Sequence, residues 1–369
     1  MTNAEPASTP GETVTITGYG SGGEGVARLS DGRVAFIRNC ARGDLLEVRL
    51  TKSHSRSAHA QIMRIITPSP YRIEPDCPAY PECGGCDFRH ITYEEELAAK
   101  LQRVNDALQR IGGLSIRATE ILNTGQTDGY RNKAVFHSDG AAIGFYASGS
   151  RKIVPVDRCL LLKPDINDAL KTLPPHGEVT LRSGKNGLGE PLEEELDGLS
   201  FEVSGFFQVN NGAALLLYKK AREYAAMQKS ETLVDLYCGV GSLTLFVGRD
   251  AGRAIGVELD PGSVTAAREN AQRNGLPHIE FIIADAAEWD CAGLIPDCII
   301  VDPPRKGLSP GAVQKIIELA PKRIVYVSCD PATLARDLRA LPGYTVRDVC
   351  AVDMFPRTAN VECCCLLER

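Results

Sequence analysis

The sequence predicts an α/β protein in which a doubly wound parallel sheet follows a small N-terminal β-barrel and a small central α+β domain. The first seventy residues contain short apolar segments separated by glycines, a pattern typical of small barrels. A central region combines clustered cysteines with further short segments. After residue 211, strand and helix patterns alternate regularly, which indicates parallel βαβ units. We therefore expect domains at 1–68, 69–210 and 211–369.

Composition limits the class of protein. The sequence has no uninterrupted apolar stretch of about 18 residues, so no transmembrane helix or membrane partner is expected. The segment 1–6 lacks the basic and apolar regions of a secretory signal, so we expect a cytoplasmic location. In that reducing compartment the 13 cysteines are not expected to form disulfides, and metal ligation or catalysis must be considered. We expect a monomer.

The predicted barrel carries a local positive charge. The whole chain has a net charge of −6, whereas residues 33–64 hold seven Lys and Arg against two Asp and Glu, a local balance of +5. Local patches, not chain averages, bind phosphate. Together with the short strands, this region resembles the TRAM domain, an OB-like RNA-binding module, and the resemblance implies an RNA partner. A barrel with a solvated charged face is the alternative. The expected strands are 14–17, 25–28, 34–37 and 45–50.

Four cysteines suggest a metal site. Three are clustered, and a fourth lies far along the chain: Cys77, Cys83, Cys86 and Cys159. Structural zinc sites usually pair two short hairpins, so this spacing favours an iron–sulfur cluster over zinc, with a disulfide least favoured. Gly84 and Gly85 would let the backbone approach the sulfides.

The rest of the central region is less regular. Residues 92–111 predict an amphipathic helix that Thr92 caps and Gly112-Gly113 terminates. Short strands are expected from residue 130 to about Phe207, and the polar, Gly- and Pro-rich segment 162–200 is expected to be a loop-bearing part of the same domain.

Acidic residues end successive strands of the predicted parallel sheet. A Gly-x-Gly turn follows the first strand, and Glu258 ends the second, 23 residues after Asp235. This is a weakened dinucleotide-binding pattern, which by itself does not separate NAD from another adenosine ligand. Adding Asp285 and Asp302 favours S-adenosylmethionine, with Glu258 at the ribose, Asp285 near adenine and Asp302 near the reacting end. Each acid taken alone has a plain alternative as a solvated loop residue or helix cap.

Several motifs together resemble the RNA uridine C5-methyltransferase family. They are Asp302-Pro303-Pro304-Arg305-Lys306-Gly307, Val327-Ser328-Cys329-Asp330-Pro331, Phe206-x-Gln208-Val209-Asn210 and the four-cysteine pattern. The resemblance covers essentially the whole chain. It implies a Rossmann-like class I methyltransferase domain behind the TRAM barrel, S-adenosylmethionine and a 4Fe-4S cluster as cofactors, and methylation of uridine C5 in RNA. The bacterial tRNA branch of the family generally lacks both the barrel and the cluster, so the resemblance implies the 23S rRNA branch.

The same resemblance assigns catalytic roles. Uracil C5 is too weakly nucleophilic to accept a methyl group unaided, and addition of a thiolate to C6 overcomes this. Cys329 would be that nucleophile, with Arg305 a source of positive charge that favours the thiolate. Glu362 would then remove the C5 proton. If the last strand is antiparallel, its start lies at the same sheet edge as the ends of the parallel strands. An exposed strand-end acid is the alternative for Glu362.

The family also implies binding residues. Asp302 would bind the uracil edge, Gln208 both donor and base, and Phe206 would stack on the flipped uridine. The predicted cofactor site comprises Gln208, Tyr237, Gly239, Ser242, Glu258, Asp285 and Asp302, and the predicted cluster ligands are Cys77, Cys83, Cys86 and Cys159. The cluster would be structural, since C5 methylation needs no electron transfer.

Two departures from the family pattern stand out. Asp330 stands where Asn is frequent and would place a negative charge near the thiolate, and Asn360 stands where His is usual. The alternatives are a tRNA uridine-54 enzyme, a non-catalytic RNA-binding protein that keeps the fold, and an amino-group methyltransferase. The last would need an aromatic residue after the two prolines, where Arg305 stands.

Overall fold

The computed structural model describes residues 11–173, 176–189, 192–203, 205–291 and 293–369. The chain forms two compact units. Unit one comprises Met1–Ala99, Phe145–Pro155 and Arg357–Ala359, and unit two comprises Lys100–Gly144, Val156–Pro356 and Asn360–Arg369. The three-domain division drawn from the sequence stays a prediction. Among the described helices, none combines the length and apolar character needed to cross a lipid bilayer.

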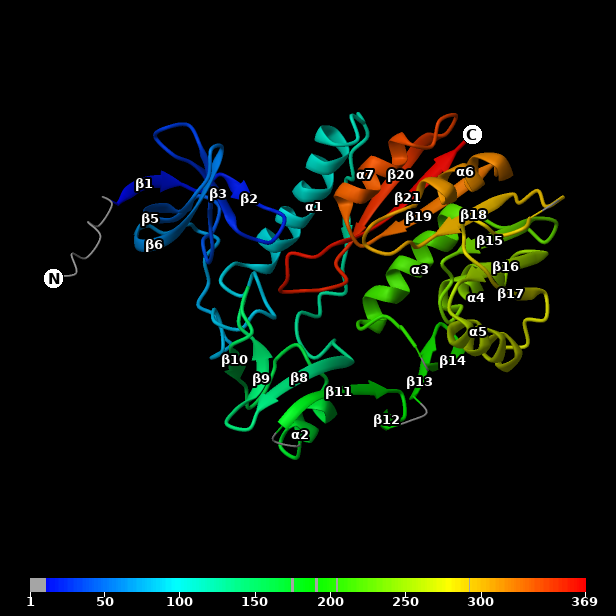
Figure 1. Cartoon of the computed structure of the whole chain (residues 1–369), viewed down its shortest axis with the longest axis horizontal. Helices are drawn as coiled ribbons and strands as arrows, with labels where there is room; N and C mark the ends of the chain where they lie inside the picture. Colours follow the sequence, from blue (N-terminus) through cyan, green and yellow to red (C-terminus); the bar gives the residue numbers. More distant parts are fainter. Residues whose placement is uncertain (1–10, 174–175, 190–191, 204, 292) are drawn as a thin grey trace, which may run out of the picture. The chain divides into compact units, whose positions relative to one another are not determined.

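Unit one contains the predicted barrel as a six-stranded sheet in the order β1-β5-β6-β4-β3-β2 (Figure 1). Its inward side chains, such as Val14, Leu46 and Val48, are almost completely buried. The long β6 was not predicted, because its alternation rests on Ala58 and Ala60, which are weak strand formers. The strands are β1 (Glu12–Thr15), β2 (Gly18–Tyr19), β3 (Gly25–Arg28), β4 (Val34–Ile37), β5 (Leu45–Ser53) and β6 (Ser57–Thr67).

The predicted helix is α1 (Tyr93–Arg110), and the unit boundary falls within it. The Thr92 hydroxyl accepts the Glu95 N–H at 3.3 Å, which confirms the predicted cap. In the part that belongs to unit two, Val104 and Leu108 are fully buried.

Unit two is built on an eight-stranded sheet in the order β17-β16-β15-β18-β19-β21-β20-β7. Strands β15 to β19 are parallel, and β21 is antiparallel to β19, as the position of Glu362 required. The strands are β7 (Ile121–Leu122), β15 (Thr232–Leu236), β16 (Arg253–Glu258), β17 (Ile279–Ile283), β18 (Cys298–Val301), β19 (Arg323–Ser328), β20 (Thr345–Val352) and β21 (Glu362–Glu368).

Helices cover both faces of this sheet (Figure 1). Helices α3 (Asn211–Ala225), α4 (Ser242–Gly248) and α5 (Pro261–Arg273) pack into one apolar core. Helices α6 (Pro310–Leu319) and α7 (Pro331–Arg339) pack into the other, together with the second part of α1. Burial of both faces explains why the central strands read as continuous apolar runs.

The segment 162–200 contains one helix and several of the short strands expected between residue 130 and about Phe207. It holds α2 (Pro164–Leu170), β11 (His176–Gly184), β12 (Gly187–Leu188) and β13 (Leu192–Leu196), and it leads into β14 (Leu199–Val203). The expected short strands are therefore present in this segment, whereas helix α2 was not predicted. In β13 the side chains alternate between buried and exposed, but buried Glu194 breaks the apolar pattern and hides the strand in the sequence. Strands β8 (Lys133–Asp139), β9 (Ile143–Tyr146) and β10 (Ile153–Pro155) complete the set.

Candidate active site

The glycine turn after β15 is the backbone of the predicted cofactor site. Tyr237, Gly239 and Gly241 all have positive φ, at 69°, 53° and 80°. A Cβ on Gly241 would lie 2.8 Å from the Phe281 ring, so only glycine fits there. The Glu258 carboxylate accepts the N–H groups of Gly239 at 3.1 Å and Asp260 at 2.9 Å. The structure thus joins the turn and the strand-end acid that the sequence paired only by spacing.

Asp235, inside β15, is a further candidate site residue that sequence reasoning did not assign. Thr244 donates its hydroxyl to one carboxylate oxygen at 2.5 Å, while the other oxygen is buried and has no hydrogen-bond partner among the described residues. Burial raises the pKa of Asp235 to about 8, Thr244 opposes this, and Asp302 and Glu258 raise it further. An acid inside an apolar strand is the signal that could have identified it.

The predicted nucleophile and base lie at neighbouring strand ends. Ser328 of β19 faces Cys363 of antiparallel β21, so Cys329 and Glu362 come next to each other at the sheet edge. Glu362 is only 5% exposed. The exposed-acid alternative for it is therefore wrong.

The charges of these groups are coupled. Burial raises the pKa of Glu362 to about 8, with a further rise from Asp302 and an opposing effect of Arg305. Burial also raises the pKa of the Cys329 thiol to about 11, Glu362 raises it further, and Arg305 lowers it. Asp302 is partly buried, and its pKa rises to about 7 for that reason. Arg305 thus acts in the predicted direction, but burial outweighs it.

The segment Phe206–Asn210 is fixed by side chains from other parts of the chain. Arg182 donates to the carbonyls of Gly205 at 3.0 Å and Phe207 at 2.9 Å, and Asn132 donates its side-chain N–H to the Gln208 carbonyl at 3.1 Å. Gln208 is buried, whereas the Phe206 ring is 72% exposed. Nothing in the sequence around Arg182 or Asn132 signals this role, because the contacts join distant segments.

The remaining predicted cofactor residues have defined surroundings. The Ser242 hydroxyl shares a hydrogen bond of 2.9 Å with Tyr218 of α3. Asp285 is exposed, accepts the Ala287 N–H at 2.7 Å, and raises the pKa of Tyr237, whose own burial is the larger cause. Asp285 thus makes the local backbone contact expected of a solvated loop residue, and it also lies near Tyr237 of the glycine turn.

The cysteine loop belongs to a different part of the molecule. Cys77, Cys83 and Cys86 lie in unit one and Cys159 in unit two, and all four side chains are partly exposed. Among the described residues, no three Cys, His, Asp or Glu side chains form a ready metal site. Burial raises the pKa of the Cys83 thiol, the Gly85 N–H lowers it, and Cys77 raises it further.

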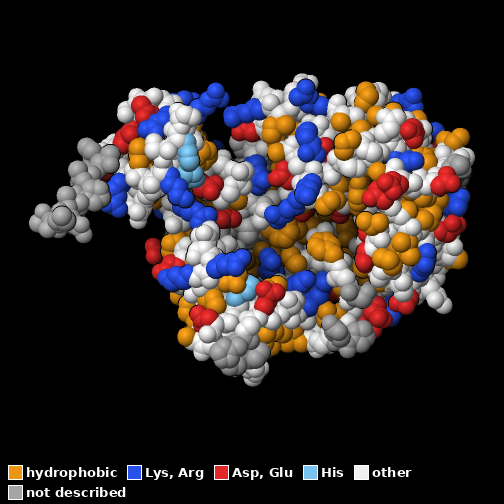
Figure 2. All heavy atoms as spheres, viewed as in Figure 1, with side chains coloured by type: hydrophobic (Ala, Val, Ile, Leu, Met, Phe, Trp, Pro, Cys, Tyr) orange, Lys and Arg blue, Asp and Glu red, His pale blue; other side chains and the backbone are white. Residues whose placement is uncertain are grey.

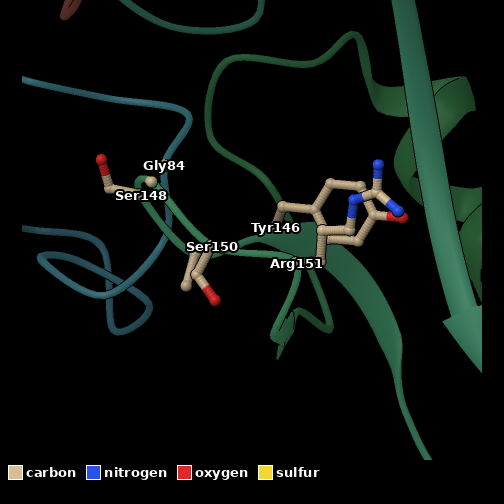
Figure 3. Close-up of a pocket in the computed structure, with 7 residues that line it drawn as sticks. Gly84, Tyr146, Ser148, Ser150 and Arg151 are labelled. Carbon is tan, nitrogen blue, oxygen red and sulfur yellow. The ribbon is translucent and has the colours of Figure 1, made fainter.

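Gly84 packs this loop against the β9–β10 turn (Figure 3). Its N–H donates to the Tyr146 carbonyl at 3.0 Å, and a Cβ there would lie 2.9 Å from that oxygen. Gly84 and residues 146–151 line a shallow hollow, in which Figure 3 shows Tyr146 and Arg151 at one end and Ser148 at the other. The structure therefore gives Gly84 a packing role, whereas a Cβ on Gly85 would lie 3.5 Å from the Cys83 sulfur.

Comparison with known proteins identifies this arrangement. The model of the tRNA (Uracil-5-)-methyltransferase family matches residues 294–369, the TRAM domain model matches 10–63, and a methyltransferase domain model matches 233–304. An uncharacterized RNA methyltransferase of Bacillus cereus is 32% identical, covering 94% of each chain. The chain belongs to the RNA uridine C5-methyltransferase family.

Further comparisons agree with this membership. An uncharacterized RNA methyltransferase of Synechocystis is 34% identical over 96% of this chain and 95% of its own. The crystal structure of Pyrococcus abyssi tRNA (uracil-54, C5)-methyltransferase with S-adenosyl-L-homocysteine superimposes with a TM-score of 0.77 at 25% identity, covering 96% of this chain and 99% of that one. The protein is thus an RNA (uracil-C5)-methyltransferase with a class I, S-adenosylmethionine-dependent domain and an N-terminal TRAM domain, as predicted.

Proposed function

We propose that this enzyme, acting as a cytoplasmic monomer, methylates C5 of a uridine in 23S rRNA through a covalent bond between Cys329 and C6. The observation that carries the proposal is the meeting of Cys329, Glu362 and Asp302 at one edge of the sheet, where both acids raise the pKa of the thiol after the larger effect of burial. A thiol beside one buried and one partly buried carboxyl group is suited to addition and elimination on a pyrimidine.

The chemical steps follow from these groups. The Cys329 thiolate adds to C6, and the electron pair of the C5–C6 double bond moves to C5. C5 then attacks the methyl carbon of the sulfonium, whose bond to sulfur breaks. Ionised Glu362 removes the C5 proton, the C5–C6 double bond re-forms, and the Cys329 sulfur leaves as thiolate. Since burial raises the pKa of Glu362 to about 8, the step that needs its ionised form should become faster as pH rises toward that value.

The residues at the glycine turn fit S-adenosylmethionine, which supplies the methyl group when bound. The unpartnered buried oxygen of Asp235 can accept an N–H from the ligand, and Glu258, held by Gly239, can accept the ribose hydroxyls. We propose Gln208, Tyr237, Ser242, Asp285 and Asp302 as the rest of this site.

Recognition of the base would use the segment that Arg182 fixes. Phe206 exposes an aromatic face on which a flipped uracil can stack, while buried Gln208 and Asp302 offer polar groups to donor and base.

The barrel supplies a surface for phosphate. Three of its seven basic side chains in 33–64, Arg33, Arg42 and Arg64, form ion pairs. Within the described part of the chain no ion pair engages the other four, which are exposed: Arg38, Arg49, Lys52 and Arg56. Figure 2 shows Lys and Arg side chains on the barrel with Asp and Glu among them, so a local patch and not overall charge would contact the RNA.

We further propose that Cys77, Cys83, Cys86 and Cys159 hold a 4Fe-4S cluster. The donor set fits, since four partly exposed thiols can be deprotonated by iron, and the Gly85 N–H lowers the Cys83 pKa against the larger effect of burial. Its chemistry would be structural. Anaerobically purified protein should show iron and broad visible absorption, whereas a colourless protein loaded with zinc would contradict the proposal.

Cys329→Ala tests the mechanism. Wild-type protein incubated with RNA containing 5-fluorouridine and S-adenosylmethionine should form an adduct stable to denaturing electrophoresis, because fluorine blocks the elimination. Cys329→Ala should form none, and Cys291→Ala, which removes another partly buried thiol, should behave as wild type. Absence of an adduct with the wild type would favour a non-catalytic RNA-binding role.

The tRNA alternative rests on the likeness to the Pyrococcus abyssi tRNA enzyme. Mass mapping of 5-methyluridine in rRNA and tRNA from a deletion strain separates the two substrates. Loss of a methyl group from 23S rRNA supports the proposal, and loss confined to tRNA position 54 overturns it.

A further inference from the structure

Asp330, the departure from the family pattern, is held firmly beside Cys329. It caps α7, and one of its carboxylate oxygens accepts the N–H groups of Ala332 and Thr333, both at 2.9 Å. The Ser328 hydroxyl accepts the Asp330 N–H at 3.2 Å and donates to its carbonyl at 3.0 Å. The negative charge is therefore fixed on the residue that follows Cys329 in the chain.

The other carboxylate oxygen of Asp330 faces a cation from a distant helix. Arg103, in the part of α1 that belongs to unit two, places its guanidinium nitrogen 3.4 Å from it. The side chains are 20% and 31% exposed, so solvent screens the pair only in part. Arg103 also acts on Cys363, the residue after Glu362, whose pKa it lowers against the larger effect of burial. Arg103 thus lies near both strand ends of the candidate active site.

Three charged groups act on the Cys329 thiol, and two more form the ion pair at the residue that follows it in the chain. Glu362 comes from β21, Asp302 and Arg305 from the loop after β18, Asp330 from the start of α7 and Arg103 from α1. Three of them are acids, and each unpaired negative charge would oppose formation of the thiolate.

We propose that Arg103 is a positioning residue that pairs with Asp330 and so keeps that carboxylate from opposing ionisation of Cys329. The inference rests on the proposed function, in which Cys329 is the nucleophile. Asn in place of Asp330 would cap the helix about as well and carry no charge. An uncharged cap needs no compensating cation, so the requirement for Arg103 depends on Asp330.

The test compares wild type with Arg103→Gln, Asp330→Asn and the double variant. The rate of Cys329 alkylation by iodoacetamide is measured from pH 6 to pH 10, with the modified peptide quantified by mass spectrometry. Because the pKa of the Cys329 thiol, about 11, lies above this range, the rate rises with pH throughout it. Arg103→Gln should displace the whole rate profile upward by about 0.5–1 pH unit, a fall of about three- to tenfold in rate at pH 7.5. The double variant should return to the profile of Asp330→Asn, which should not lie at higher pH than that of the wild type.

Controls separate charge from fold. Arg103→Lys keeps the charge and should keep the profile, and Arg347→Gln breaks an ion pair with Glu368 at the other end of β21 and should change nothing. An unshifted Arg103→Gln, or a double variant shifted as far as Arg103→Gln, would overturn the inference. If Arg103→Gln fails to fold, the alkylation profiles of the double variant and of Arg103→Lys test the inference in its place. A wild type that forms no adduct with 5-fluorouridine RNA defeats the proposed function separately, since the alkylation profile needs no RNA.

Discussion

The strand-end site of unit two and the cysteine loop of unit one are assembled in different ways. At the sheet edge, backbone register alone brings Cys329 next to Glu362, and Glu258 onto the glycine turn. In the cysteine loop, three thiols share a short stretch of unit one and the fourth belongs to unit two. The described residues form no ready metal site there.

The two sites differ in what fixes the positions of their side chains. A sheet fixes its strand ends through many hydrogen bonds, so a site there exists before any ligand binds. A loop of thiols gains its geometry from the metal, because ligand binding and folding are coupled. The first site should therefore be sensitive to single side chains, and the second to the metal as a whole.

Removal of the proposed base should have the largest effect. Glu362→Gln should lower turnover by about 10²- to 10⁴-fold, because the C5 proton is then not removed. The adduct should still form with ordinary uridine RNA and accumulate. Methyl incorporation from labelled donor, together with denaturing gels, measures both. Glu368→Gln, at the far end of the same strand, is the control, and unchanged turnover of Glu362→Gln would disprove the role.

The hydrogen bond between the glycine turn and Glu258 should control the affinity for the methyl donor. Glu258→Ala removes the acceptor of the Gly239 N–H and the proposed ribose contact, so the affinity for S-adenosylhomocysteine should fall by about 10- to 150-fold. Calorimetric titration gives the value. Glu280→Ala on the adjacent β17, where Glu280 pairs with exposed Arg253, should bind as wild type does. Equal affinities would show that Glu258 supports only the turn.

Loss of a proposed cluster ligand in the cysteine loop should reduce metal binding and leave donor binding at the sheet edge unchanged. Cys83→Ser should reduce the iron content by at least about tenfold, while the affinity for S-adenosylhomocysteine stays within about twofold. Iron assay and calorimetry on the same anaerobic sample measure both, with Cys291→Ser as the matched control. A parallel loss of donor binding would mean that the two sites are not independent.

The smallest effect is on stability. The folded pKa of Glu362, about 8, lies above its ordinary value, so its proton stabilises the fold at low pH and this contribution is lost as pH rises through 8. From pH 7 to pH 8 the wild type should lose about 1 kcal/mol of unfolding free energy relative to Glu362→Gln. Urea unfolding at both pH values tests this, and identical losses would show that the buried acid is not protonated at pH 7.

Much of the fold could be predicted because local residues encode it. The apolar runs of β18 and β19 and the cap at Thr92 are signals of adjacent residues, and the structure confirms them. The predictions failed where the pattern was mixed. Ala58 and Ala60 hid β6, and buried Glu194 hid β13, since alternation is legible only when the inward residues are strongly apolar.

The sequence by itself determined which chemical groups exist and which strand each follows, because glycine turns and apolar runs act over a few residues. Only the tertiary structure decided that β21 enters antiparallel with Glu362 beside Cys329, that Arg182 holds the Phe206 segment, and that Arg103 faces Asp330. These contacts join residues up to hundreds of positions apart. Their partners are selected by packing of the whole domain, which no local pattern records.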